Sequence, residues 1–366
     1  MVKATDDHSR PNMPLPHDAS IVYRGGLFVL ALFACLYAAR EVVLPLVLAF
    51  FLKLLVQPAM KLLKRLRVPR LVAALLAVAL LLGIFFGLAD LLSSPAAEWA
   101  QRLPQGLPRL QQRVRIISQP MDKLGKLFKH AQSAVVGSGA QPPSSGGTDF
   151  QQLLLSTMHH FASGFVWTML MLFFLLLAGD TFLRRLVEVM PTFGDKRQVI
   201  DIAQQVESDI SVYLITITIM NTLVGIAIGV GMWLLGLPDP LLWAVTAFML
   251  NYVPIFGPLT GMVMFLAVGM LSLDPLWKAF MPMAVYICVH VTEGEAVTPM
   301  ILARRFTLNP VLVMASLLFW DWMWGIPGAV LAVPLLAIFK IVCDRVRPLA
   351  ALGHFIQGER RRVWEP

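Results

Sequence analysis

Apolar residues in this chain gather into long runs that short polar or charged segments separate. The runs suited to crossing a bilayer are 21–39, 42–56, 71–92, 158–178, 213–235 and 277–297. Most of them approach the ~20 residues that a helix needs to cross roughly 30 Å of hydrocarbon. The pattern therefore predicts an all-α polytopic membrane protein with about six full transmembrane helices.

Two further apolar stretches, 241–271 and 308–340, are long and interrupted near their midpoints. A single helix over the second would measure about 48 Å, which exceeds the thickness of the bilayer core. Gly and Pro lie in the middle of both stretches, where they add flexible positions and remove backbone donors. We expect two re-entrant helical hairpins, 241–271 and 310–340, each broken at Pro and Gly. The alternative is two long helices with proline kinks.

Broken backbone at membrane depth is tolerated only where protein buries it or a watery cavity borders it. Paired interrupted segments are accordingly the best sequence indication of a transporter binding site. The candidate pathway residues are Asn251, Tyr252, Pro254, Gly257 and Pro258 in the first hairpin, and Trp320, Asp321, Trp324, Gly325 and Pro327 in the second.

Two of these polar residues each allow two interpretations. Asn251 can hydrogen-bond a hydroxylated solute, or it can hold a broken helix together. Asp321 can contact a cation or the solute, because a carboxylate at membrane depth needs water or a partner. It can equally cap the hinge by accepting from the backbone amides of Met323 or Trp324.

A titratable cluster, His290, Glu293 and Glu295, lies at the end of the 277–297 run. His290 and Glu293 are three residues apart, so they share a helical face and can titrate as a pair, as proton coupling requires. The alternative places the two glutamates at the membrane interface, where Arg304 or Arg305 neutralises them.

Composition supports an integral membrane protein, with 57% hydrophobic and only 14% charged residues. The net charge of +8 does not indicate nucleic-acid binding, because the basic residues lie in short loops, as orientation signals do. The group from Lys61 to Arg70 contains no acid and marks the cytoplasmic side, which places both termini inside. Cys35, Cys288 and Cys343 are isolated, so we expect no disulfide, no metal site and no cofactor.

The polar segments divide the chain. A disordered cytoplasmic lead, 1–20, precedes the first three transmembrane helices within 21–92. Region 93–156 is expected outside the cell as short amphipathic helices divided by Pro104, Pro108 and Pro120, followed by a Gly/Ser/Pro linker. The transmembrane core, 157–342, contains a charged cytoplasmic connector at 180–211, and 343–366 forms a basic cytoplasmic tail.

Enzyme signatures are missing from the sequence. There is no G-x-x-x-x-G-K-[ST] phosphate loop and no H-E-x-x-H zinc motif. The Gly-Asp pairs at 179–180 and 194–195 lack the first glycine of the G-x-G-D pattern of intramembrane aspartyl proteases. We therefore expect a protein that is not an enzyme.

The run 308–341, L-N-P-V-L-V-M-A-S-L-L-F-W-D-W-M-W-G-I-P-G-A-V-L-A-V-P-L-L-A-I-F-K-I, resembles the autoinducer-2 exporter family of bacterial inner-membrane proteins. The first hairpin, with N-Y-V-P-I-F-G-P at 251–258, and L-P-L at 44–46 resemble it too, so the likeness covers about 21–355. Two positions depart from the family pattern: Asp321 replaces a small residue between the tryptophans, and Ala303 replaces a glycine.

The resemblance implies export of a small solute, such as a signalling molecule, and assembly as a homo-oligomer, for which a pentamer is one arrangement. Some members of the family are credited with sodium/proton exchange. The sequence thus favours a secondary exporter that works by alternating access around the two hairpins, with a small solute and the lipid bilayer as partners and no nucleic acid. The alternatives are a sodium/proton antiporter and a membrane scaffold whose 93–156 region binds a partner.

Overall fold

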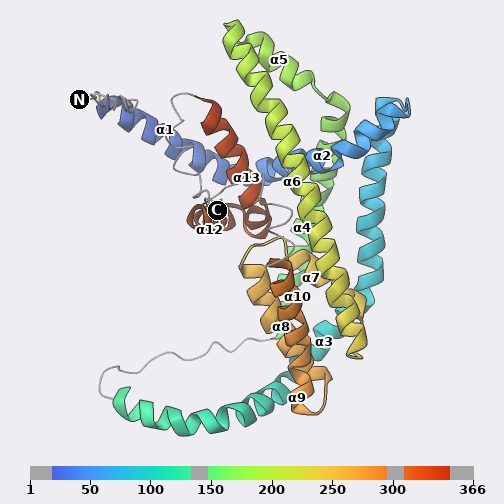
Figure 1. Ribbon diagram of the computed structural model, residues 1–366, viewed down its shortest axis with the longest axis vertical. Coiled ribbons are helices and arrows are strands. Elements are labelled where there is room, and N and C mark those ends of the chain that lie inside the picture. The colour runs from blue at the N-terminus through green and yellow to red at the C-terminus, as the bar shows by residue number, and fades with distance from the viewer. Residues whose placement is uncertain (1–18, 133–146, 295–308, 347–366) are drawn as a thin grey trace, which may run out of the picture.

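The computed structural model describes residues 19–132, 147–294 and 309–346. Within these ranges every regular element is a helix (Figure 1), which confirms the all-α class. The helices are α1 (Ala19–Ala38), α2 (Arg40–Arg65), α3 (Arg70–Gln132), α4 (Gly147–Ala178), α5 (Thr181–Val189), α6 (Phe193–Leu234), α7 (Pro240–Leu250), α8 (Phe256–Ser272), α9 (Leu276–Ala279), α10 (Met281–Thr292), α12 (Pro310–Trp324) and α13 (Ile326–Arg345). The predictions for the lead, the Gly/Ser/Pro linker, Glu295, Arg304, Arg305 and the C-terminal tail fall largely or wholly outside these residues.

Four helical segments in the described ranges are long and apolar enough to cross a membrane: 40–65, 70–102, 193–234 and 326–345. A fifth arises if 163–178 and 181–189, which meet at a bend of 67°, form one span. Leu75, Leu76 and Leu80 on α3 are each more than half exposed, as a lipid-facing surface requires. The chain is therefore a polytopic membrane protein, whereas six full spans and re-entrant hairpins remain predictions.

Both predicted helix breaks are present. Helix α7 ends at Leu250 and α8 begins at Phe256, with five residues between them. Helix α12 ends at Trp324 and α13 begins at Ile326, so that Gly325 alone separates them. The interruption by Pro and Gly thus located the two breaks correctly.

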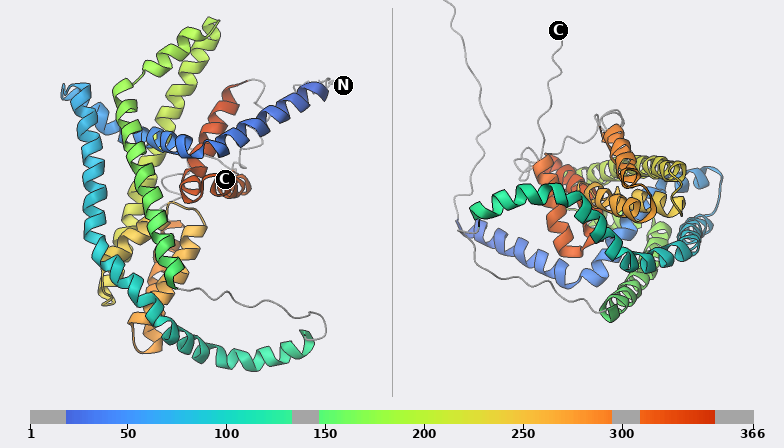
Figure 2. Two further views of the ribbon diagram at one scale, coloured as in Figure 1. Left: turned by 180° about the vertical axis from the view of Figure 1, so that it is seen from behind. Right: turned by 90° about the horizontal axis from the view of Figure 1, so that it is seen from below.

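The prediction of short amphipathic pieces after residue 92 was wrong. Helix α3 continues without interruption through Pro104, Pro108 and Pro120, and its second half curves away from the other helices (Figures 1 and 2). A proline removes one backbone hydrogen bond and bends a helix, but it need not end one. Similarly, part of the expected cytoplasmic connector is continuous with the next transmembrane run in α6.

Helix α6 is the central element, because it packs against α2, α7, α10 and α13. One buried cluster joins Ile228 of α6 to Trp243 of α7, Phe265 of α8 and Tyr286 of α10. A second joins Ile210 of α6 to α2 and α13. Apolar packing on α6 thereby fixes the position of the first broken pair, α7 and α8.

Candidate functional site

The first break, residues 251–255, contains a strained backbone. Ile255 has φ 66° and ψ −55°, and across it the amide of Phe256 donates to the carbonyl oxygen of Pro254 at 2.7 Å. This is the γ-turn with positive φ, which is rare and strained. For a β-branched residue such a conformation costs about 1–3 kcal/mol and persists only where surrounding contacts hold it.

Side chains of α6 hold this break in place. Asn251 Nδ2 donates to Asn221 Oδ1 at 2.9 Å, and Tyr252 Oη donates to Thr218 Oγ1 at 3.0 Å. Thr218 and Asn221 are three residues apart and therefore lie on one face of α6. The first break is thus attached to the central helix by two polar contacts.

The ends of α7 and α8 approach each other closely at Gly257. A Cβ atom at this position would collide with the carbonyl oxygen of Leu250. Gly257 also accepts a long hydrogen bond, 3.4 Å, from Tyr286 Oη of α10. Glycine is therefore required here by close packing of backbone.

A cavity of about 680 Å³ borders this break. Its polar lining comes from Asn221, Asn251, His290 and Glu293, which belong to α6, to the break and to the end of α10. Apolar side chains such as Met220, Met262 and Ile287 form the remaining wall. The structure thus brings Asn251, Pro254 and Pro258 together with the predicted coupling residues His290 and Glu293, whereas Tyr252 and Gly257 lie beside the lining.

Two side chains of the cavity wall carry buried polar atoms that have no hydrogen-bond partner within the described residues: Asn221 Nδ2 and His290 Nε2. Asn221 is only 1% exposed, and the ring of His290 packs on the ring of Tyr286, with centroids 4.4 Å apart. A buried polar atom without a partner costs about 1–3 kcal/mol. Neither atom has appreciable accessible surface in this conformation, so a bound molecule would recover that energy once the side chains turn toward the cavity.

The second break has a different construction. Gly325 has φ +67° and ψ −151°, a conformation open essentially to glycine alone, and its amide donates to the carbonyl oxygen of Asp321 at 2.7 Å. A Cβ atom at Gly328 would collide with the carbonyl oxygen of Trp320. Pro327 lies in the first turn of α13, where a missing amide donor is harmless. Backbone geometry shapes this break, and further from it Ser316 Oγ of α12 donates to Ala332 O of α13 at 3.0 Å.

The aromatic residues of the second break pack on one another. The rings of Trp320 and Trp324 lie 4.6 Å apart, and Trp322 stacks on Tyr37 of α1 at 5.5 Å. Asp321 is exposed, and within the described residues its carboxylate makes neither the predicted cap bond nor an ion pair. None of the five predicted residues of this break lines the cavity of the first.

The two breaks nevertheless touch. Val253, in the middle of the first break, packs against a cluster formed by Leu317 of α12 with Ala329 and Ala332 of α13. Trp320 packs against the same cluster. A movement of one broken pair would therefore change the packing of the other.

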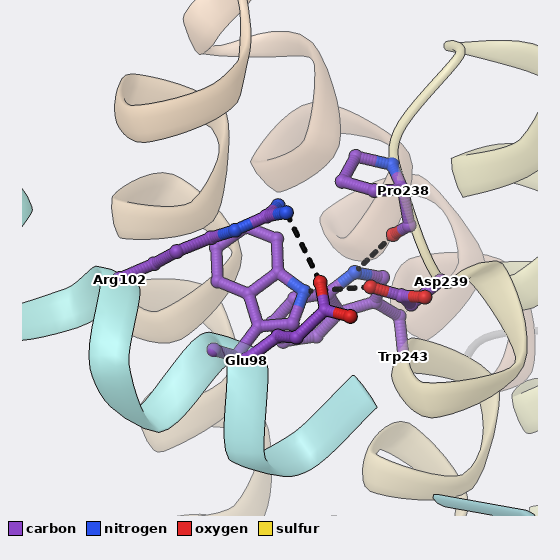
Figure 3. Close-up of polar contacts among 6 residues, drawn as sticks. Glu98, Arg102, Pro238, Asp239 and Trp243 are labelled. Carbon is purple, nitrogen blue, oxygen red and sulfur yellow. Dashed lines mark hydrogen bonds and ion pairs between the residues drawn. The ribbon is translucent and has the colours of Figure 1, made fainter. Parts of the chain in front are cut away.

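The part of α3 from Trp99 to Arg113 contacts the start of α7 and the end of α8. These contacts are called the α3 bracket below. Trp99 Nε1 donates to Asp239 Oδ2 at 3.1 Å, next to the start of α7, while Arg102 pairs with Glu98 at 3.1 Å (Figure 3). Buried Arg113 donates to the carbonyl oxygens of Met270 (2.7 Å) and Leu273 (2.8 Å) at the end of α8. One helix thus holds both outer ends of the first broken pair.

Sequence reasoning missed three residues of this site: Thr218, Asn221 and Tyr286. Asn221 is a lone amide within the apolar run 213–235, and that isolation was the available signal, since polar residues within transmembrane runs usually face a partner or a cavity. Tyr286 carried no comparable signal, because aromatic residues are ordinary components of a helical core.

Comparison with known proteins agrees with this architecture. The chain is 25% identical over 316 residues to a putative transport protein of Haemophilus influenzae, covering 86% of this chain and 90% of that protein. It is 26% identical over 331 residues to the AI-2 transport protein TqsA of Escherichia coli, covering 89% and 92%. The putative transport protein YhhT of Escherichia coli is 26% identical over 322 residues, covering 86% and 87%. The model of the AI-2E family transporters matches residues 27–347, and the chain therefore belongs to that family.

Proposed function

We propose that this chain is a secondary transporter that exports a small solute by alternating access around its two broken helical pairs, α7/α8 and α12/α13. The observation that carries the proposal is the cavity of about 680 Å³ beside the first break, with the unpartnered atoms of Asn221 and His290 in its wall. A cavity of this size, mostly apolar with a few convergent polar groups, is typical of small-molecule sites.

The polar lining favours a small hydroxylated solute, and autoinducer-2 is the candidate that the name of the Escherichia coli relative supplies. Asn221 Nδ2 can donate to a hydroxyl oxygen, and the free ring nitrogen of His290 can hydrogen-bond a second hydroxyl. The mostly apolar remainder of the wall would accept the carbon skeleton. The second break, which contacts the first through Val253, would act as the hinge.

A second candidate function, sodium/proton exchange, is favoured by one observation: His290 and Glu293 border the same cavity. A change of charge on either side chain would alter the charge that the cavity presents. If exchange is the function, vesicles containing the protein will show sodium-dependent proton movement that Glu293→Gln abolishes.

The setting of the transporter is part of the same proposal. We place it in the bacterial inner membrane with both termini in the cytoplasm, as a homo-oligomer. The basic residues around Lys61 to Arg70 support the orientation, and the family supports the membrane. Accessibility of cysteines introduced near either end tests the orientation, and cross-linking in membranes tests the assembly.

Asn221→Leu tests the export proposal. The substitution removes the free amide and the bond to Asn251 while keeping a side chain of similar volume. Export of autoinducer-2, measured from cells that lack other exporters, should fall at least about tenfold, which corresponds to the free energy of one hydrogen bond between protein and solute.

Thr222→Val is the matched control, because Thr222 follows Asn221 on α6 and is exposed, and its hydroxyl donates to Thr218 O of its own helix, its one side-chain hydrogen bond among the described residues. It should export normally. Equal export by Asn221→Leu and the control, at equal amounts in the membrane, would refute a role for this cavity.

A further inference from the structure

A second cavity, of about 310 Å³, is lined by residues of α2, the start of α3, the end of α4 and α6. The ribbons show these helices and the α2–α3 turn (Figures 1 and 2). Its lining contains the basic side chains Lys53, Lys61, Lys64 and Arg70. Two carboxylates, Asp180 and Glu207, also line it. The cavity is therefore rich in positive charge, and the proposed solute pathway does not use it.

The basic residues form one stripe along α2. Lys53, Gln57, Lys61 and Lys64 are spaced by four, four and three residues, which places them on the same helical face. Like charges three or four residues apart destabilise a helix slightly. The stripe therefore does not stabilise α2 by itself, and binding of a group of opposite charge would relieve the repulsion.

Existing partners satisfy only part of this charge. Lys53 Nζ donates to Gly179 O at 3.4 Å and Arg70 Nε donates to Leu176 O at 3.0 Å, both at the C-terminal end of α4. These carbonyl groups accept hydrogen bonds but carry only the partial charge of a helix end. Lys53 and Arg70 are thus held by backbone carbonyl groups, and these contacts do not neutralise their positive charges.

The other charged residues of the lining also leave positive charge without a strong partner. Lys61 approaches Glu207 at 3.8 Å, in a pair that is largely exposed and therefore weak. Within the described residues Lys64 has no ion pair. An anion in the cavity would meet up to four cations, whose charge exceeds that of the carboxylates of Asp180 and Glu207.

We propose that this cavity binds a phosphate group, carried either by the headgroup of an anionic lipid or by a soluble phosphate ester. Phosphate presents several strong acceptor oxygens, which suits convergent ammonium and guanidinium donors. The volume of about 310 Å³ accommodates a headgroup-sized molecule. Basic side chains at a membrane-facing turn are also attracted to anionic lipid surfaces.

The test uses the full-length chain purified in an uncharged detergent. Binding of phosphatidylglycerol is titrated by native mass spectrometry, with zwitterionic phosphatidylcholine as the baseline. Lys61→Gln/Lys64→Gln removes two exposed lining charges and should weaken phosphatidylglycerol binding about tenfold or more.

The control is Arg65→Gln/Arg67→Gln, which removes the same charge from the same turn at positions outside the lining. It should bind phosphatidylglycerol nearly as the unmodified chain does. Equal loss in both variants would indicate a diffuse basic surface and overturn the proposal, as would no loss in either.

Competition identifies the source of the phosphate. Glycerol 3-phosphate and inorganic phosphate are added to the lipid-bound protein. Displacement of the lipid by glycerol 3-phosphate, with the same dependence on Lys61 and Lys64, assigns the site to a soluble ester. Lipid binding that neither soluble probe reduces assigns it to the lipid headgroup.

Discussion

The two broken helical pairs carry the same sequence signal yet differ in construction. In the α7/α8 break, side-chain hydrogen bonds from α6 hold a strained Ile255 beside a cavity. In the α12/α13 break, Gly325 has a conformation open essentially to glycine alone, the rings of Trp320 and Trp324 pack at a tilt, and its predicted residues do not line that cavity. The difference agrees with the proposal that the first break presents polar groups to a solute and that the second acts as a hinge.

The largest expected effects come from the glycines at which backbone meets backbone. Gly257→Ala in the first pair and Gly328→Ala in the second each place a methyl group against a carbonyl oxygen. Each should lower stability by about 3 kcal/mol, the upper range for overpacking. The midpoint of thermal unfolding in detergent, followed by tryptophan fluorescence, measures this loss.

Gly87→Ala on α3 is the control, because a Cβ there meets open space. It should leave the midpoint unchanged or raise it, since alanine favours a helix over glycine. If Gly328→Ala behaved like this control, the second break would not be tightly packed.

The next pair of substitutions should change stability in opposite directions at the two breaks. Gly325→Ala should destabilise the protein by about 2 kcal/mol, because φ +67° with ψ −151° is unfavourable for any side chain. Ile255→Gly should instead stabilise it by about 1 kcal/mol, because glycine adopts the positive φ of the γ-turn without strain. The midpoint of thermal unfolding measures both changes. If both variants shifted the midpoint in the same direction, the two breaks would not differ in the way proposed.

Sequence reasoning found the breaks because Pro and Gly in the middle of an apolar run act locally. It did not find the cavity, because Asn221 lies 30 residues before its partner Asn251 and only folding onto α6 brings them together. The role of Asp321 stays a prediction: the side chain is exposed, and an acidic residue within an apolar run does not by itself reveal which way it faces. Sequence reasoning also treated Pro104 and Pro108 as helix ends, although α3 continues through both.

The smallest expected change in stability concerns the α3 bracket, the contacts of α3 with the start of α7 and the end of α8. Trp99→Phe keeps an aromatic ring against Trp243 but removes the 3.1 Å hydrogen bond to Asp239. The loss should be about 1 kcal/mol. Arg185→Gln, which breaks the exposed pair with Glu188 on α5, should change the unfolding midpoint very little. Identical shifts in the two variants would argue against the bracket.

Protection of an introduced cysteine by the solute tests the central claim most directly. Ile255→Cys and Ile326→Cys place one thiol beside each break, at residues that are 49% and 75% exposed, in a chain whose Cys35, Cys288 and Cys343 are replaced by serine. The rate of alkylation in membrane vesicles is then compared with and without autoinducer-2. Bound solute should slow alkylation at position 255 and leave the rate at position 326 unchanged. Protection at 326 alone, or at neither position, would contradict it.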